Sequence, residues 1–126
     1  MKKALLLVFI LAIFLMMGCV GGIKIYTDSG QTIGISVNQE FVIALGSNQT
    51  SGHSWQGSYD KAMLELVEKT YRSEREDEGN AVGIGGGVEF FRFKGLVVGK
   101  TKITLTYKRP WEEESVDQKV FTVNIK

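Results

Sequence analysis

Apolar and polar residues alternate along several short stretches of this chain, and this period of two constrains the fold more than any other feature. Successive side chains of a β-strand point to opposite faces, so such alternation predicts half-buried strands. In TIGISV the apolar positions are Ile33, Ile35 and Val37, and in EFVIAL one face carries Phe41, Ile43 and Leu45. Helical periodicity is absent, so we expect an all-β domain.

Further runs of residues that are rich in β-branched and aromatic types predict additional strands. They are IKIYT (23–27), LELVEKTYR (64–72), VEFFRFKG (88–95), KITLTYK (102–108) and VFTVNIK (120–126). The nearest candidate for a helix is DKAMLELVEK (60–69), but its apolar spacing fits a strand better. Seven or so short strands separated by turn residues predict a two-sheet sandwich, because a parallel α/β sheet would need crossover helices.

The N-terminus has the features of an export signal. Two lysines precede fourteen uninterrupted apolar residues, 4–17, and Gly18 and the only cysteine, Cys19, follow them. The ending MMGC resembles a lipobox, in which the cysteine is diacylated on its sulfur and becomes the first residue of the mature chain. We therefore predict a lipoprotein signal peptide over 1–18, a short tether over 19–23 and a folded domain over 24–126.

A second interpretation of the N-terminus stays open. Residues 4–23 form a span of twenty residues without charge, about the length that crosses a bilayer as an uncleaved anchor. The lipoprotein is favoured because the apolar run ends in glycines where a helix should continue. Both interpretations place the domain outside the cytoplasm, tethered to the cell membrane.

Charge and rare residues exclude several classes of function. The formal net charge of +1 gives no indication of nucleic-acid binding. Since Cys19 is assigned to the anchor, the domain has no disulfide, thiolate metal ligand or cysteine nucleophile. His53 is the only histidine, so neither a zinc site nor a nucleophilic triad can be assembled around it. We expect that the chain is not an enzyme and that it binds no metal or cofactor. We also expect a monomer that is stabilised by its own core.

Three connections have the composition of shaped loops, because they combine glycine, proline, hydroxyl and aromatic residues. They are GSNQTSGHSW (46–55), AVGIGGG (81–87) and KRPWEEES (108–115). A fourth, RSEREDEGN (72–80), is typical of a solvated hairpin tip. The glycine-rich loop is followed by a strand rather than by the helix that a phosphate site needs. Its glycines therefore indicate positive φ angles, close approach of another surface, or a wide turn without a partner.

The third loop contains Pro110, the only proline of the chain. Pro110 fixes its own φ and restricts Arg109, so Arg109 and Trp111 are presented with little conformational entropy left to lose on contact. Arginine and tryptophan are also the residue types most often found as binding hot spots. The alternative is that Trp111 folds back over the end of its own sandwich, with Arg109 stacked on it.

Together, the three loops resemble the segments that identify chagasin-type inhibitors (inhibitor family I42) of papain-like cysteine proteases: N-P-T-T-G-Y/F, G-x-G-G and R-P-W. The matching residues are Asn48, Gln49, Thr50, Ser51, Gly52 and His53, then Gly83, Ile84, Gly85 and Gly86, then Arg109, Pro110 and Trp111. The likeness covers about residues 30–126. It implies an immunoglobulin-like β-sandwich of about seven antiparallel strands, with the three loops gathered at one end.

The resemblance also implies a function: reversible, non-covalent inhibition in which the three loops block the protease cleft. Thr50 and Ser51 would lie over the catalytic cysteine, and the glycine loop and Trp111 would contact the cleft walls. Gln49, Ser51 and His53 depart from the proline, threonine and aromatic residue of the family pattern. We therefore predict a weaker or narrower inhibitor whose affinity depends on pH, because the charge of an imidazole changes between about pH 5 and 8.

A rival hypothesis is a tethered adhesion or envelope-assembly module, since immunoglobulin-like scaffolds carry many unrelated functions. Such a module gives no reason for the three loop segments to occur together. An enzyme is the third hypothesis, and it lacks a nucleophile, base and orienting group in one constellation.

Overall fold

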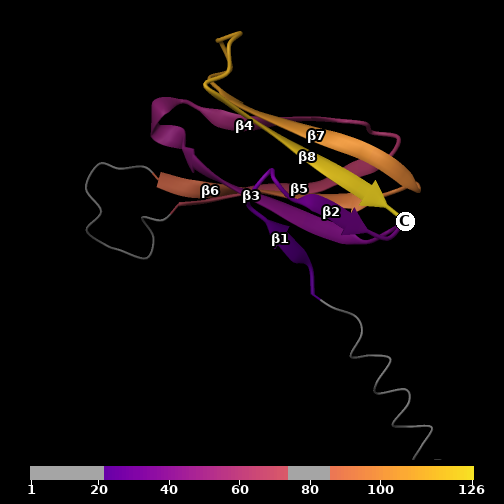
Figure 1. Cartoon of the computed structure of the whole chain (residues 1–126). Coiled ribbons are helices and arrows are strands. Elements are labelled where there is room, and N and C mark those ends of the chain that lie inside the picture. Colours follow the sequence, from indigo (N-terminus) through magenta and orange to yellow (C-terminus); the bar gives the residue numbers. More distant parts are fainter. Residues whose placement is uncertain (1–21, 74–85) are drawn as a thin grey trace, which may run out of the picture.

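The computed structural model describes residues 22–73 and 86–126, which form eight β-strands in two packed sheets (Figure 1). The strands are β1 (Lys24–Tyr26), β2 (Thr32–Ile35), β3 (Glu40–Asn48), β4 (Ser54–Tyr59), β5 (Leu64–Ser73), β6 (Gly86–Gly95), β7 (Gly99–Lys108) and β8 (Asp117–Ile125). Sheet A has the order β1-β3-β6-β5, and sheet B has the order β2-β8-β7-β4. The prediction of an all-β, immunoglobulin-like sandwich is confirmed.

The structure has eight strands rather than about seven. The additional strand is β4, which was not predicted: its first two residues were assigned to a loop. In SWQGSY only Trp55 is buried. Gly57 and Ser58 have weak strand preference, so the period-two pattern is missing from this stretch. Pairing with β7 over Ser54–Tyr59 makes it a strand, and this pairing is a tertiary contact that local sequence does not encode.

The prediction of purely antiparallel pairing is wrong for two strands. β1 pairs with β3 in parallel, and β2 pairs with β8 in parallel. The chain passes from sheet A to sheet B and back over β1, β2 and β3, so no tight hairpin joins β1 to its neighbour. Antiparallel direction is imposed by short hairpins, whereas side-chain alternation is the same in both kinds of pair.

Val37 was predicted to share the inward face of Ile33 and Ile35, but it is 36% exposed. β2 ends at Ile35, and a turn follows in which Gln39 N donates to Ser36 O over 3.0 Å. Asn38 in this turn has a φ of 70°, a conformation that asparagine tolerates better than most residues. The turn breaks the alternation before Val37.

The core lies between the sheets and is dominated by aromatic and branched side chains. Along β6, every second side chain from Gly87 to Gly95 is buried. Phe93 is 0% exposed, and its ring centroid lies 5.7 Å from that of Phe41 and 5.1 Å from that of Tyr59. The inward face that the sequence predicts for β3 is confirmed, because Phe41, Ile43 and Leu45 are buried.

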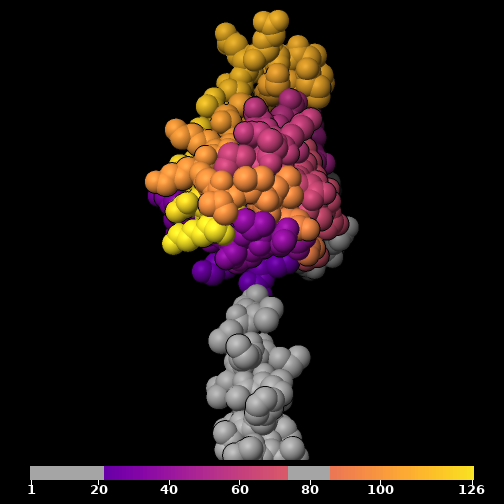
Figure 2. Space-filling model, turned by 90° about the vertical axis from the view of Figure 1, so that its right-hand side faces the viewer, coloured from indigo at the N-terminus to yellow at the C-terminus, as the bar shows by residue number. Residues whose placement is uncertain are grey.

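The β7–β8 loop and the N-terminal side of the described chain lie on opposite sides of the sandwich (Figure 1). The loop between β7 and β8 projects beyond the body, and β1, the first described strand, lies on the opposite side (Figures 1 and 2). Within residues 22–73 and 86–126, no helix is long and apolar enough to cross a membrane. The predicted signal peptide and Cys19 lie outside the described residues.

Candidate binding site at one end of the sandwich

Segments that are distant in sequence meet at one end of the sandwich. β3 ends at Asn48, which pairs with Gly86 at the start of β6. β4 begins at Ser54, which pairs with Lys108 at the end of β7. The first loop, 49–53, is therefore flanked by the end of the glycine segment on one side and by the R-P-W segment on the other.

We call this surface the loop end and define it by the described residues of the three motifs: Asn48 to His53, Gly86, and Arg109 to Trp111. The remaining predicted site residues, Gly83, Ile84 and Gly85, lie outside the described residues. The loops are shorter than predicted, because β3 extends to Asn48, β6 starts at Gly86 and β7 extends to Lys108.

The first loop is held by its own hydrogen bonds. Gln49 to Ser51 form a short 3₁₀ turn, η1 (Gln49–Ser51), and the side chain of Asn48 caps it by accepting from Thr50 N over 3.2 Å. Gly52 closes the turn in the left-handed conformation, with a φ of 84°, and donates its N–H to Gln49 O. The Asn48 cap restrains the turn although Gln49 occupies the position of the family's proline.

The other two departures from the family pattern contact each other. Ser51 Oγ lies 2.6 Å from His53 Nδ1 and 2.8 Å from Asn48 O, to which it donates. The His53 ring lies 5.2 Å from the Tyr107 ring in a tilted arrangement, so it packs as an aromatic residue would. Ser51 and His53 therefore brace the loop across its base, and both are half-buried.

Arg109 joins the third loop to the first. Its Nε donates to Ser51 O over 2.9 Å, and its Nη1 forms an ion pair with Glu112 Oε1 at 3.0 Å. Glu112 N donates to the carbonyl oxygen of Arg109, so Pro110 occupies the second position of a four-residue turn, which proline favours. The two loops form one hydrogen-bonded unit.

Trp111 is mostly free for contact with a partner. Its side chain approaches Gly52, because a Cβ built there would lie 3.1 Å from Trp111 Cη2. The Arg109 guanidinium lies 6.0 Å from the centroid of the indole ring. The residue is nevertheless 71% exposed. Trp111 therefore rests one edge on the first loop and offers most of its surface to solvent, so it is not buried over its own sandwich.

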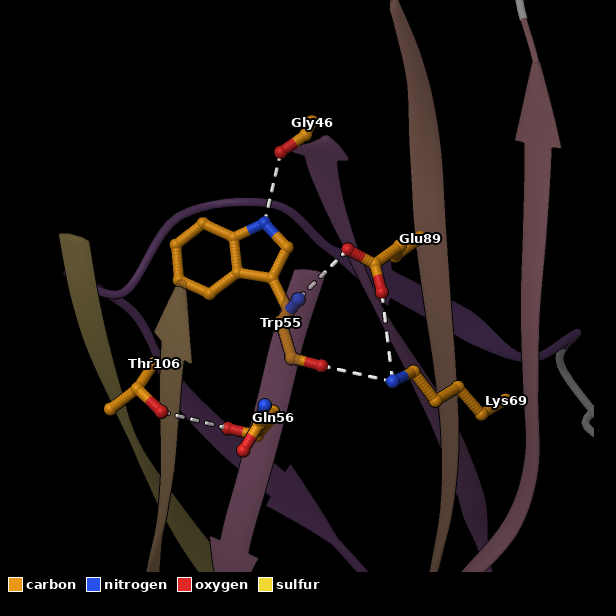
Figure 3. A network of polar contacts seen from close by, with 6 residues as sticks. All are labelled: Gly46, Trp55, Gln56, Lys69, Glu89 and Thr106. Carbon is orange, nitrogen blue, oxygen red and sulfur yellow. Dashed lines mark hydrogen bonds and ion pairs between the residues drawn. The ribbon is translucent and has the colours of Figure 1, made fainter. Parts of the chain in front are cut away.

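Two aromatic residues that the sequence did not mark as functional support the first loop from below. Tyr107 Oη accepts from Asn48 N over 2.8 Å, and the Trp55 ring stacks on Tyr107 with centroids 5.0 Å apart. Trp55 Nε1 donates to Gly46 O over 2.9 Å (Figure 3). The alternation in KITLTYK places Tyr107 on the same face as Ile103 and Leu105, and this was the available signal.

Gly87 follows the glycine motif and is required by close packing. A Cβ there would lie 2.5 Å from Tyr71 Cζ and 2.7 Å from the carbonyl oxygen of Arg72. Neither Gly86 nor Gly87 is among the described residues with positive φ. Gly87 is therefore explained by packing within the domain, against Tyr71 and Arg72 of β5, and the explanations proposed for the glycine-rich loop stay predictions.

Gly87→Ala is expected to lower the free energy of unfolding by about 1–3 kcal/mol, because the new methyl group overpacks against Tyr71. Urea unfolding measures the change. Gly34→Ala on β2 is the matched control, since a Cβ at Gly34 would meet nothing within 4 Å. Equal unfolding free energies for the two variants would contradict the packing explanation.

The described residues of the loop end include no cluster of metal ligands. In the part of the chain that the structure describes, no group of three or more histidine, cysteine, aspartate or glutamate side chains could hold a metal ion. The loop end instead combines exposed backbone, a hydroxyl residue at Thr50 and a protruding indole, which suit binding to a concave partner.

Sequence and structure comparisons agree on the family. Chagasin from Trypanosoma cruzi is 30% identical over 104 residues, which cover 78% of this chain and 90% of chagasin. The crystal structure of the cysteine protease inhibitor EhICP2 from Entamoeba histolytica is 26% identical, with a TM-score of 0.67 and coverage of 84% and 99% of the two chains.

A second similar structure, PbICP-C in complex with falcipain-2, shares the fold at 18% identity, with a TM-score of 0.54 over 85% of this chain and 96% of that one. The sequence model of the chagasin family of peptidase inhibitors, I42, matches residues 34–125. Members of this family are inhibitors, so the prediction that the chain is not an enzyme is confirmed. The chain belongs to the chagasin family of peptidase inhibitors.

Proposed function

We propose that this protein is a reversible, non-covalent inhibitor of papain-like cysteine proteases, and that the loop end blocks the active-site cleft. The observation that carries the proposal is the Arg109 hydrogen bond to Ser51 O, which joins two of the three motif loops into one unit. A preorganised unit loses little conformational entropy on binding, so its contacts contribute more fully to affinity. The family match and the described function of EhICP2 support the same target class.

The three loops have separate roles in this proposal. Thr50, which is exposed at the tip of the first loop, and Ser51 lie over the catalytic cysteine of the protease. Trp111 contacts one wall of the cleft, and the glycine segment 83–86 contacts the other. Inhibition needs only that the substrate is excluded, and no bond to the catalytic sulfur forms.

The test is to titrate residues 20–126 against papain and measure residual activity on a small fluorogenic peptide. We expect inhibition that is stoichiometric at high concentration, that is reversed on dilution, and that leaves the inhibitor chain uncut by mass spectrometry. Full papain activity at micromolar inhibitor would contradict the proposal and favour the adhesion or envelope-assembly module.

The Ser51–His53 pair predicts coupled mutational effects. Ser51→Ala and His53→Ala should each weaken papain inhibition by about 3- to 10-fold, because both remove the Ser51–His53 contact, and Ser51→Ala also removes the hydrogen bond to Asn48 O. The double variant should lose less than the product of the two effects, since both single changes break the same contact. Inhibition constants for the four proteins test this, and fully multiplicative losses would contradict the coupling.

We propose that Cys19 carries a lipid that anchors the mature protein to the outer side of the cell membrane. The register of β1 supports this, because Lys24 pairs with Phe41 near the start of β3, whereas the loop end lies at the other end of β3. A tether before Lys24 leaves the loops accessible. Full-length protein should fractionate with membranes and carry the mass of a diacylglyceryl group, and Cys19→Ser should be found without it. Membrane association of Cys19→Ser with the N-terminus intact would support the uncleaved anchor instead.

A further inference from the structure

Glu89 is a charged side chain inside the sandwich. It lies on the inward face of β6 and is 1% exposed, and no other charged residue is buried in the described part of the chain. Burial of a carboxylate is unfavourable unless it is paired and hydrogen-bonded. A position between Gly87 and Phe91 is otherwise suited to an apolar residue, so Glu89 needs an explanation.

Glu89 and Lys69 both contact the backbone of a single residue, Trp55 (Figure 3). Glu89 Oε2 accepts from Trp55 N over 2.9 Å. Lys69 Nζ donates to Trp55 O over 2.9 Å and lies 3.6 Å from Glu89 Oε1. The two side chains come from β6 and β5 of sheet A, whereas Trp55 belongs to β4 of sheet B.

The pair takes the place of a neighbouring strand. β4 is an edge strand of sheet B, so its outer backbone groups have no strand to pair with. Glu89 supplies an acceptor for the Trp55 N–H, and Lys69 supplies a donor for the Trp55 carbonyl. Lys69 Nζ also lies 5.1 Å from the centroid of the Phe91 ring, although the side chain is 42% exposed. Together they attach β4 to the opposite sheet.

The attachment lies directly beneath the loop end. Trp55 lies two positions after His53, and its indole both stacks on Tyr107 and donates to Gly46 O. Tyr107 in turn accepts from Asn48 N at the start of the first loop. Holding the Trp55 backbone therefore holds the C-terminal end of the first loop. It also holds the aromatic contact, through Tyr107, that supports the N-terminal end of the loop at Asn48.

We propose that Glu89 and Lys69 are positioning residues for inhibition, which hold the first loop in its binding geometry through Trp55. They touch no protease residue in this proposal. The prediction about inhibition rests on the proposed function, whereas the prediction about the loop can be measured without any protease.

The test compares full domains carrying Glu89→Gln and Lys69→Met, which keep side-chain length and remove the charge. Amide hydrogen exchange by NMR should be about 10-fold faster at Trp55 and Thr50 and unchanged at Phe93, because only local opening is affected. Inhibition constants for papain should rise about 10- to 100-fold, as expected when hydrogen bonds to charged groups are lost. Lys69→Arg should keep the wild-type values of both measurements, since a guanidinium can reach the same two acceptors, Trp55 O and Glu89 Oε1.

Glu68→Gln and Lys61→Met are the matched controls, because neither side chain takes part in the hydrogen bonds and ion pair that join Glu89, Lys69 and Trp55, and neither should change either readout. Faster exchange at Phe93 equal to that at Trp55 would overturn the proposal in favour of a general effect on stability. Local loosening of Trp55 with an unchanged inhibition constant would also overturn it. If wild-type protein does not inhibit papain, the proposed function fails, and the exchange of Trp55 and Thr50 still decides whether the pair positions the loop.

Discussion

Replacing Trp111 with alanine should weaken papain inhibition by about 30- to 1,000-fold, the loss typical of a tryptophan hot spot. The indole is 71% exposed and contacts only the edge of the first loop, so its removal costs the fold little. Thermal unfolding should therefore have the same midpoint as the wild type. Inhibition assays and calorimetry on one preparation separate the two quantities.

Val116→Ala is the control for this experiment. Val116 follows Trp111 in the same β7–β8 connection and is 64% exposed, but it lies outside the three motif segments. Its truncation should change the inhibition constant less than about 3-fold, as for most surface contacts outside a hot spot. Equal effects of the two truncations would show that the R-P-W segment has no special role.

The largest expected effect on stability follows from Phe93→Ala. Phe93 is 0% exposed and packs between Phe41 and Tyr59 at the centre of the sandwich. Its truncation should lower the free energy of unfolding by about 3–5 kcal/mol, since it removes buried area and leaves a cavity. For a domain of this size the melting temperature should fall by roughly 10 °C or more.

Urea unfolding measures this loss, and Val98→Ala provides the comparison because Val98 is 65% exposed in the turn after β6. A change within about 0.5 kcal/mol is expected for the control. A loss below about 1 kcal/mol for Phe93→Ala would contradict the packing of the core described above.

Side-chain alternation predicted the sandwich well where one face of a strand is buried. β2 and β3 were found from this signal, and Phe41, Ile43 and Leu45 are buried as expected. The signal failed at β4, where Trp55 is buried and Tyr59 packs against the core but Gly57 lies between them on the same face. It also carries no information about strand direction, so the parallel pairs of β1 and β2 were missed.

The site was predictable as a set of residues and less so as a structure. The motifs identify the three loops, but the Asn48 cap and the Arg109 bond to Ser51 depend on where distant segments meet. The Glu89–Lys69 pair was not predicted either, because the position of Glu89 in phase with Phe91 and Phe93 does not by itself show which partner would hold its carboxylate. Pairs that bridge the two sheets follow from tertiary packing alone.

These contacts explain how a domain without disulfides can present a stiff binding surface. Hydrogen bonds within the first loop, the aromatic support of Tyr107 and Trp55, and the Arg109 bridge each remove freedom that binding would otherwise have to remove. The loss of the family's proline at Gln49 is offset in part by the Asn48 cap. The prediction of a weaker or narrower inhibitor, and of an affinity that changes with pH through His53, stays open to the papain titration.

The most direct test of the central claim is protection of the catalytic cysteine of papain from alkylation. Papain is incubated with increasing amounts of the domain and then with iodoacetamide, and the modified cysteine is quantified by mass spectrometry. If the loop end occupies the cleft, alkylation should fall in proportion to the bound fraction and return to its full rate after dissociation. Tight binding with an unchanged alkylation rate would contradict the account, because the cleft would then be open in the complex.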